Sequence, residues 1–406
     1  MKGNRRQLGP ICASLAVAML TATMQLAGQN VSTSALRDAA QSIAAGNLEH
    51  AERELQSVLR TLPGDDRALD LMGVIRVQQH REPEAEKMFQ QAIRRKPDFA
   101  GAHVHLGLLY VQIGRRAEAV AQLQEGLRID PTRTDASAAL VYIWRDDAWV
   151  AATAGDSEKA LALLIDARKL APDNPDVQFA FGMIALKMSL LPDAIEALQK
   201  TLKLRDNDPM ALYGLGRALM GMSKFEDARR QFARYTELRP DDASGHCALG
   251  MTLAALERSM EARTQFEKSI AITPAQTESY FRLGLLDLDS KDLDAAAKNF
   301  RHALDRDPRH PGARAALGRV EFEQKHYTEA ADLLKQAMAI DDSLREAHYY
   351  LGLTFARMGR KQESDEQLRI ATRMEHDEVE KRRAILRIED PGDPSRLDPP
   401  VSATPK

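Results

Sequence analysis

The sequence contains few of the residues that dominate several common protein classes. Only 2 of its 406 residues are cysteine, which excludes a disulfide framework and a cysteine-based zinc site. Aromatic residues make up 5% of the chain, and the abundance of Ala, Leu, Arg and Glu favours helices over strands. The formal charge is -3, so the chain lacks the basic excess that binds a nucleic-acid backbone. We therefore expect an all-α protein that binds no nucleic acid.

The N-terminal residues 1–31 differ from the rest of the chain. Lys2, Arg5 and Arg6 are positive, and no charged residue lies between Leu8 and Gly28. A short basic start followed by an uncharged apolar stretch is typical of a secretory signal. About 20 uncharged residues are also long enough to span a bilayer. The pattern predicts an exported protein, periplasmic or extracellular, whose N-terminus is a signal peptide or a membrane anchor.

Prolines recur along the chain with a spacing of 34 residues. One series is Pro63, Pro97 and Pro131, and a second is Pro240, Pro274 and Pro308. Placing these prolines at position 32 of a repeat defines ten repeats over residues 32–378. The repeats begin at residues 32, 66, 100, 141, 175, 209, 243, 277, 311 and 345. Seven extra residues, 134–140, precede the fourth repeat.

Three other positions follow the same period. Position 8 is Gly in eight repeats, position 20 is Ala in nine, and position 24 is always Leu or Phe. In the second repeat these residues are Gly73, Ala85 and Phe89. The spacing predicts two antiparallel helices per repeat, with small residues where the helices approach and a large residue beside them. Because one pair cannot bury its own apolar face, the pairs should stack into a solenoid.

This pattern resembles the tetratricopeptide repeat family, whose 34-residue helix pairs also have Gly at position 8, Ala at position 20 and Pro at position 32. The resemblance covers most of the chain. It implies an all-α, right-handed superhelical solenoid whose concave face is built from the first helix of each repeat. It says little about function, because the family serves many unrelated partners.

The ends of the array and its insertion depart from the regular repeat. Residues 379–389 are predicted to form a short capping helix over the exposed apolar end. Residues 390–406 contain five prolines and are predicted to be a disordered tail. The insertion should lengthen the first helix of the fourth repeat to about Ala136–Thr153. This helix carries both tryptophans, of which Trp144 is expected to pack internally and Trp149 to face the groove.

The resemblance also implies which side chains line the concave face, because it places positions 2, 5, 9, 12 and 13 of each first helix there. Aromatic, Met and Arg residues at these positions suit an extended or helical peptide with apolar anchors. The alternative is that half of them form core between adjacent repeats. The candidate groove residues are Tyr142, Arg145, Trp149, Phe179, Met183, Tyr213, Arg217, Met220, Met251, Phe281, Arg319, Phe322 and Tyr349.

Motifs for specialised binding or catalysis are missing. No repeat has the Lys and Asn of the family's carboxylate clamp, and none has Asn at position 6. There is no phosphate-binding glycine loop, nucleophile elbow or zinc-binding His pair. His103 and His105 are too close in sequence to chelate one metal from a helix, and acidic pairs such as Asp65–Asp66, Asp241–Asp242 and Asp341–Asp342 suit helix capping. We expect no catalytic residue, cofactor or metal.

These observations together favour a non-catalytic scaffold that binds a partner protein or peptide along the concave groove. Assembly of an envelope or secretion complex is a natural setting for an exported repeat protein. Two alternatives remain at this point. One is an accessory or regulatory subunit of an envelope enzyme, bound through the convex face, and the other is a glycan-modifying enzyme with a site in the groove.

Overall fold

The computed structural model describes residues 31–389 of the chain, and it describes their side chains from residue 33 to residue 377. Over this range the backbone forms twenty helices joined by short turns, without a strand. The chain is therefore an all-α tandem array, as predicted. The predicted disordered tail and all but the last residue of the predicted signal lie outside the described residues.

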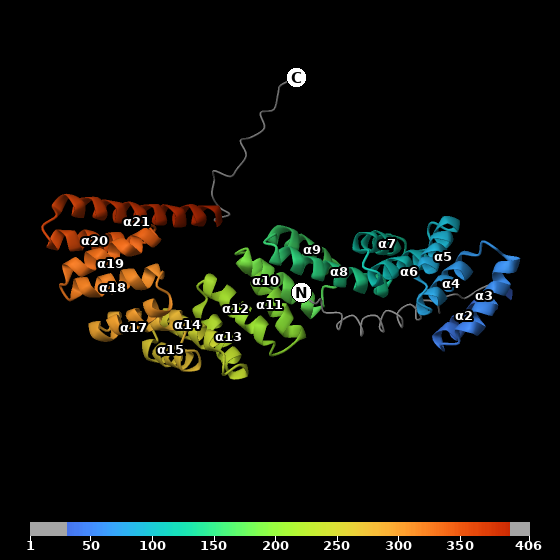
Figure 1. Cartoon of the computed structure of the whole chain (residues 1–406), viewed down its shortest axis with the longest axis horizontal. Helices are drawn as coiled ribbons and strands as arrows, with labels where there is room; N and C mark the ends of the chain where they lie inside the picture. Colours follow the sequence, from blue (N-terminus) through green and yellow to red (C-terminus); the bar gives the residue numbers. More distant parts are fainter. Residues whose placement is uncertain (1–30, 390–406) are drawn as a thin grey trace, which may run out of the picture. The chain divides into compact units, whose positions relative to one another are not determined.

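The backbone divides into two compact units, with the boundary between Ala218 and Leu219 inside α12. The first unit holds five helix pairs and the start of a sixth (Figure 1). Its helices are α2 (Val31–Ala44), α3 (Leu48–Thr61), α4 (Asp66–Gln78), α5 (Glu82–Arg95), α6 (Ala100–Gln112), α7 (Arg116–Ile129), α8 (Thr134–Thr153), α9 (Ser157–Leu170), α10 (Pro175–Lys187), α11 (Leu191–Leu204) and the start of α12 (Pro209–Gly221).

The second unit continues the same alternation of first and second helices. After the end of α12, its helices are α13 (Phe225–Leu238), α14 (Ala243–Ala255), α15 (Ser259–Ile272), α16 (Thr277–Asp289), α17 (Leu293–Arg306), α18 (Pro311–Glu323), α19 (Tyr327–Ile340), α20 (Arg345–Arg357) and α21 (Lys361–Glu389).

The turn inside each repeat has a constant conformation. The second helix of each repeat begins at position 17. The residue at position 15 has a positive φ in every described repeat. Glycine occupies position 15 in four repeats, as at Gly155 with φ +90°. Other residues adopt the same conformation elsewhere, as at His80 with φ 56° and Ser189 with φ 61°. This left-handed residue reverses the chain, and only glycine adopts it without steric cost.

The close approach of the two helices explains the periodic glycine and alanine. A Cβ atom on Gly73 would lie 2.4 Å from Cε1 of Phe89, and one on Gly107 would lie 2.7 Å from Cγ of Leu123. Ala85, at position 20 of the second repeat, is fully buried. The prediction that small residues at positions 8 and 20 let the backbones approach, with a large residue at position 24 beside them, is confirmed.

Histidine at position 4 joins neighbouring repeats. In the third repeat, His103 Nδ1 lies 2.8 Å from Oε1 of Gln122, and its Nε2 lies 2.9 Å from the Pro97 carbonyl oxygen of the preceding repeat. His246 and His348 make the same pair of contacts in their repeats. His103 is therefore a packing histidine that links two repeats through hydrogen bonds.

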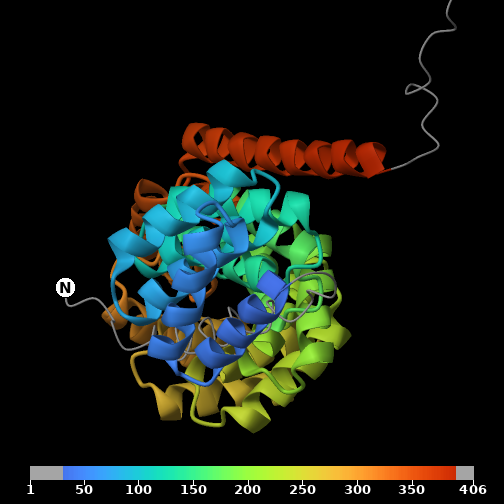
Figure 2. The same ribbon diagram turned by 90° about the vertical axis from the view of Figure 1, so that its right-hand side faces the viewer.

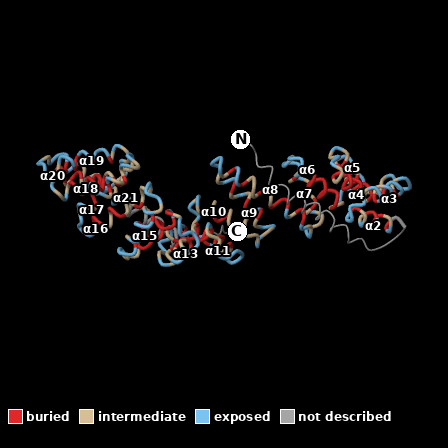
Figure 3. The backbone as a smooth tube through the Cα atoms, turned by 60° about the horizontal axis from the view of Figure 1, so that its bottom comes forward, coloured by how far each residue is buried: buried red, intermediate tan, exposed pale blue. Residues whose placement is uncertain are grey.

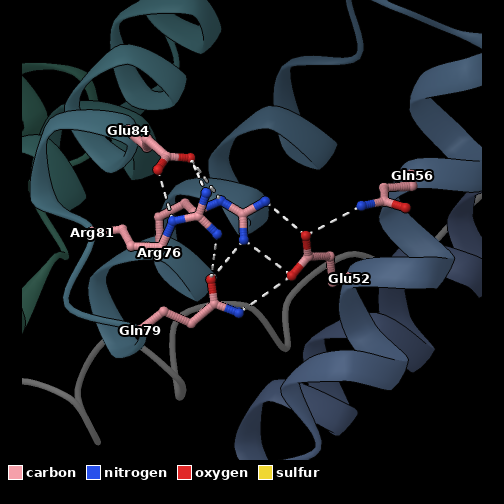
Figure 4. Close-up of polar contacts among 6 residues, drawn as sticks. All are labelled: Glu52, Gln56, Arg76, Gln79, Arg81 and Glu84. Carbon is pink, nitrogen blue, oxygen red and sulfur yellow. Dashed lines mark hydrogen bonds and ion pairs between the residues drawn. The ribbon is translucent and has the colours of Figure 1, made fainter.

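A second inter-repeat contact joins position 11 of one repeat to position 21 of the repeat before it (Figure 4). Arg76 on α4 donates two hydrogen bonds, of 3.0 and 2.7 Å, to the Glu52 carboxylate on α3. The side-chain amide of Gln79 accepts a hydrogen bond from Arg76 and donates one to Glu52. The hydrogen bond from Arg76 lowers the pKa of Glu52 against the opposing effect of burial. In the third repeat, the Tyr110 hydroxyl donates to Glu86 across the equivalent interface.

The insertion and the C-terminal end differ from the regular pairs. Helix α8 has 20 residues, close to the predicted Ala136–Thr153, and Leu140 in its extra turns is fully buried. Residues 379–389 continue α21 in one unbroken helix instead of forming a separate one (Figure 2). Their role as a cap stays a prediction, because their side chains are not described.

The helix N-termini confirm capping for two of the three acidic pairs. The side chain of Asp65 accepts hydrogen bonds from the Arg67 and Ala68 amides at the start of α4, and Asp242 caps α14. The prediction was wrong for the third pair. Asp341 accepts from the Ser343 amide in the turn before α20, where Leu344 is the N-cap residue.

Candidate binding surface on the first helices

The first helices of the second and third repeats are sealed. Every residue from Ala68 to Val77 on α4 and from Gly101 to Tyr110 on α6 is buried (Figure 3). The residues at positions 5 and 9, which the repeat pattern assigns to the groove, are 0–4% exposed on these two helices. They are Asp70, Val74, Val104 and Leu108. No candidate groove residue came from these repeats, and their first helices offer little accessible surface.

A buried charged cluster lies in the sealed region. Asp70 on α4 contacts Nδ1 of His105 on α6 at 2.8 Å, and both side chains are at least 95% buried. Nε2 of His105 is buried without a hydrogen-bond partner. Next in sequence to α8, Arg133 donates two hydrogen bonds, of 2.9 and 2.6 Å, to Asp135 in the extra turns of that helix.

The two pairs of this cluster are electrostatically linked. Burial raises the pKa of the Asp135 carboxyl, but Arg133, the Ala136 amide and the field of His105 outweigh it and hold that pKa below 3.8. Burial lowers the pKa of Arg133, but its hydrogen bond to Asp135 and the charges of Asp135 and Asp70 outweigh burial and raise that pKa. The cluster thus joins α4, α6 and α8, and the seven-residue insertion supplies one of its carboxylates. No periodic position of the sequence marks this cluster, so the repeat pattern does not predict it.

A more accessible surface follows on the first helices of the fourth to sixth repeats. We call it the open patch. On α8 and α10 its side chains are partly or largely exposed, and α8 and α10 are in contact. Seven of the thirteen candidate groove residues belong to it. They are Tyr142, Arg145 and Trp149 on α8, Phe179 and Met183 on α10, and Tyr213 and Arg217 on α12.

The two tryptophans of α8 have different environments, as predicted. Trp144 is 9% exposed and belongs to the core of the first unit, whereas Trp149 is 71% exposed. Val150 beside it is 58% exposed. Met183 forms the floor between α10 and α12, since a Cβ on Gly214 would lie 2.9 Å from its sulfur. Exposed tryptophans are enriched among the residues that dominate binding at protein interfaces.

An ion-pair chain crosses the open patch. Arg145 on α8 bonds Asp176 on α10 at 3.0 Å, and Arg205 bonds the second oxygen of Asp176 at 2.5 Å. The hydrogen bond from Arg205 is the main cause of the lowered pKa of Asp176. Arg205 also contacts Asp208 at 3.0 Å. Arg145 is therefore held by Asp176 of the neighbouring repeat, which Arg205 also binds, and no sequence motif marks either of these two residues.

In the second unit, three candidate residues gather around a residue that sequence reasoning missed. Phe322 on α18 lies 5.8 Å from the ring of Tyr350 on α20, and Tyr349 lies 5.3 Å from the same ring. Arg319 stacks over Tyr350 at 5.1 Å and bonds Glu346 at 2.9 Å. Tyr349 is 41% exposed. Tyr350 occupies position 6. This position is not among positions 2, 5, 9, 12 and 13, which the family resemblance assigns to the groove.

The other three candidate residues of this unit are Phe281, Met220 and Met251. They lie on helices other than α18 and α20. Phe281 packs against Phe300 and His310, with ring centroids 6.0 and 4.7 Å away. The Thr252 hydroxyl donates a hydrogen bond to the sulfur of Met220 at 3.2 Å. Met251 is half-buried on α14. Phe281 thus matches the alternative that some candidate residues are core between repeats.

The described residues contain neither a metal-binding cluster nor a membrane-spanning helix. Between residues 31 and 389, no group of three or more His, Cys, Asp or Glu side chains is arranged to hold a metal ion. Within the same range no helix is both long enough and apolar enough to cross a membrane.

Comparison with known proteins agrees with this architecture. Two family models, each described as a tetratricopeptide repeat, match the chain over more than half of its length. One matches residues 76–141 and 287–354, and the other matches residues 146–209 and 213–277. No curated protein sequence matches the chain significantly.

Several solved structures are similar to parts of the chain. A crystal structure of MamA is 26% identical, with a TM-score of 0.38, and covers 40% of this chain and 94% of MamA. YrrB, described as a tetratricopeptide repeat protein with an unusual peptide-binding site, is 20% identical, with a TM-score of 0.37 and coverage of 45% and 95%. The repeat domain of P58(IPK) is 16% identical, with a TM-score of 0.31 and coverage of 82% and 99%.

Proposed function

Because the chain belongs to the tetratricopeptide repeat family, we propose that it is a non-catalytic scaffold that binds a partner protein or peptide along its first helices. The observation that carries this proposal is the contrast in exposure on those helices. Equivalent positions are sealed on α4 and α6 but carry accessible aromatic and cationic side chains on α8 to α12. Aromatic and arginine side chains that remain accessible are enriched at protein–protein contacts.

The setting we propose is outside the cytoplasm. The basic and then uncharged residues 1–31 support export, with the N-terminus cleaved as a signal or kept as an anchor. The scaffold would then act in assembly of an envelope or secretion complex. Cell fractionation and the mass of the mature N-terminus test this part. A full-length chain found only in the cytoplasm would overturn it.

The binding proposal is tested by cross-linking in the native cell, comparing three chains. The first is wild type, and the second carries Trp149→Ala with Tyr349→Ala, one change in each unit. The third carries Met260→Ala, which removes a 77% exposed side chain from the second helix α15. Circular dichroism controls for folding.

We expect the double variant to lose at least one partner that the wild type and the Met260→Ala chain both capture. Capture that survives the double change but is lost with Met260→Ala would contradict binding by the first helices. It would favour the accessory-subunit alternative, with contact through the second helices.

A further inference from the structure

The open patch contains two basic side chains that pair with no carboxylate among the side chains of residues 33–377. Lys187 on α10 donates to the Ala152 carbonyl oxygen at 3.1 Å, and Arg217 on α12 is exposed. Lys187 is at position 13 of its repeat and Arg217 is at position 9, both of which the family resemblance assigns to the groove.

The acidic residues near the patch already have partners. Asp176 binds both Arg145 and Arg205. On the other flank of α8, Asp146 and Asp147 both bind Arg116 on α7. The accessible charge that remains on the first helices α10 and α12 is therefore positive, and it lies beside the apolar side chains of the patch.

The spacing of these features fits a short peptide segment. Packed helices lie about 8–10 Å apart, so side chains on α8 and α12 are separated by roughly 16–20 Å along the array. An extended segment of about six residues spans that distance. Trp149 offers a large apolar surface on α8. Lys187 offers a cation beside the C-terminal end of the same helix, and Arg217 offers a second cation on α12.

We propose that the open patch binds an acidic peptide segment of a partner protein, with a large apolar side chain against Trp149 and carboxylates against Lys187 and Arg217. Charge complementarity decides the class of occupant, because a basic segment would face two uncompensated cations. This inference rests on the proposed scaffold function and adds the chemistry of the partner.

The test uses the full-length chain and fluorescein-labelled peptides of about ten residues. Each peptide carries four Glu or Asp residues and one Leu or Phe, with the spacing varied across the set. Matched peptides have every carboxylate replaced by the corresponding amide. Fluorescence anisotropy measures the dissociation constants, and tryptophan emission of the wild-type and Trp149→Phe chains reports whether a peptide covers that ring.

We expect at least one acidic peptide to bind at least about tenfold more tightly than its amide form, with affinity falling as salt rises. Lys187→Glu with Arg217→Glu should weaken binding by about tenfold or more. The matched control is Lys203→Glu, an exposed lysine on the second helix α11, which should leave the affinity unchanged.

Three outcomes would overturn the acidic-peptide proposal: no acidic peptide binds, the amide forms bind equally well, or the double reversal has no effect. If cross-linking still depends on Trp149 in that case, the scaffold function stands and only the partner chemistry is wrong. If cross-linking depends on neither unit's surface, the scaffold proposal fails independently of the peptide result.

Discussion

The first helices of the sealed and the open regions use one repeat framework for two different surfaces. In both regions the pair is closed by glycine against a large residue, with Gly107 close to Leu123 and Gly182 equally close to Leu198. At position 9, however, Leu108 is 1% exposed, whereas Trp149 is 71% exposed. The framework positions therefore maintain the fold, and the residue types at the groove positions decide whether a repeat is closed or available to a partner.

The largest contrast should appear between the two tryptophans of α8. Trp144→Ala removes a buried ring and should lower the free energy of unfolding by about 3–5 kcal/mol. Trp149→Ala removes an exposed ring and should change it by less than about 0.5 kcal/mol. Urea denaturation followed by circular dichroism measures both. Equal losses would mean that Trp149 packs internally.

The buried cluster should make the sealed region sensitive to loss of a charge. Asp135→Ala leaves Arg133 without its carboxylate, and we expect a loss of roughly 3 kcal/mol in unfolding free energy. Asp332→Ala, at an exposed position of α19, is the matched control and should have almost no effect. A small loss at both positions would contradict a stabilising role for the cluster.

The same carboxylate predicts a dependence on pH. The pKa of Asp135 is lowered in the folded chain, so its contribution is present above 3.8 and is lost as the pH falls through the lower folded value. Denaturation curves should therefore show that the wild type loses more stability than Asp135→Ala when the pH is lowered through that range. Parallel losses in the two chains would refute this assignment.

The shared framework should respond alike in both regions. A valine side chain at Gly107 or Gly182 would place Cβ 2.7 Å from the γ carbon of Leu123 or Leu198. We expect each Gly→Val change to cost about 1–3 kcal/mol by overpacking, with similar values at the two sites. Thermal unfolding of the two variants measures the difference. A cost confined to the sealed region would show that the repeats are not built alike.

The smallest predicted effect concerns the turn inside each repeat. Ser189→Gly should stabilise the chain by up to about 1 kcal/mol, because it relieves a left-handed backbone conformation. Gly155→Ala should destabilise it by a similar amount, since no atom lies within 4 Å of the added Cβ and only the backbone is strained. Differential scanning calorimetry resolves both shifts. A change of the same sign in both variants would contradict the steric explanation.

The periodic part of the fold was predictable from the sequence, and the specific contacts between repeats were not. Gly73 and Phe89 lie in one repeat, and the recurrence of their residue types at fixed positions indicates that they touch. Asp70 and His105 are 35 residues apart, and their pairing depends on how two repeats stack. No other repeat carries an equivalent pair to reveal it.

For the candidate surface too, the sequence predicted positions in the repeat but not the contacts between repeats. The family's groove positions selected Trp149, Arg319 and Tyr349 as candidates, and the structure shows that Trp149 and Tyr349 are exposed. They missed Tyr350 and Arg205, because the roles of these two residues depend on contacts that cross from one repeat to another. They also included Phe281, whose ring is partly buried and packs against Phe300 and His310.

The length of the insertion in α8 has a consequence for the direction in which the open patch points. Seven residues turn an α-helix by about 700°, only about 20° short of two full revolutions. The added turns therefore leave Tyr142, Arg145 and Trp149 in nearly the angular phase that an uninterrupted repeat would give them. An insertion of five residues would rotate the same side chains by about 500°, which leaves them about 140° away from that phase. For the open patch, the number of inserted residues matters more than their identity.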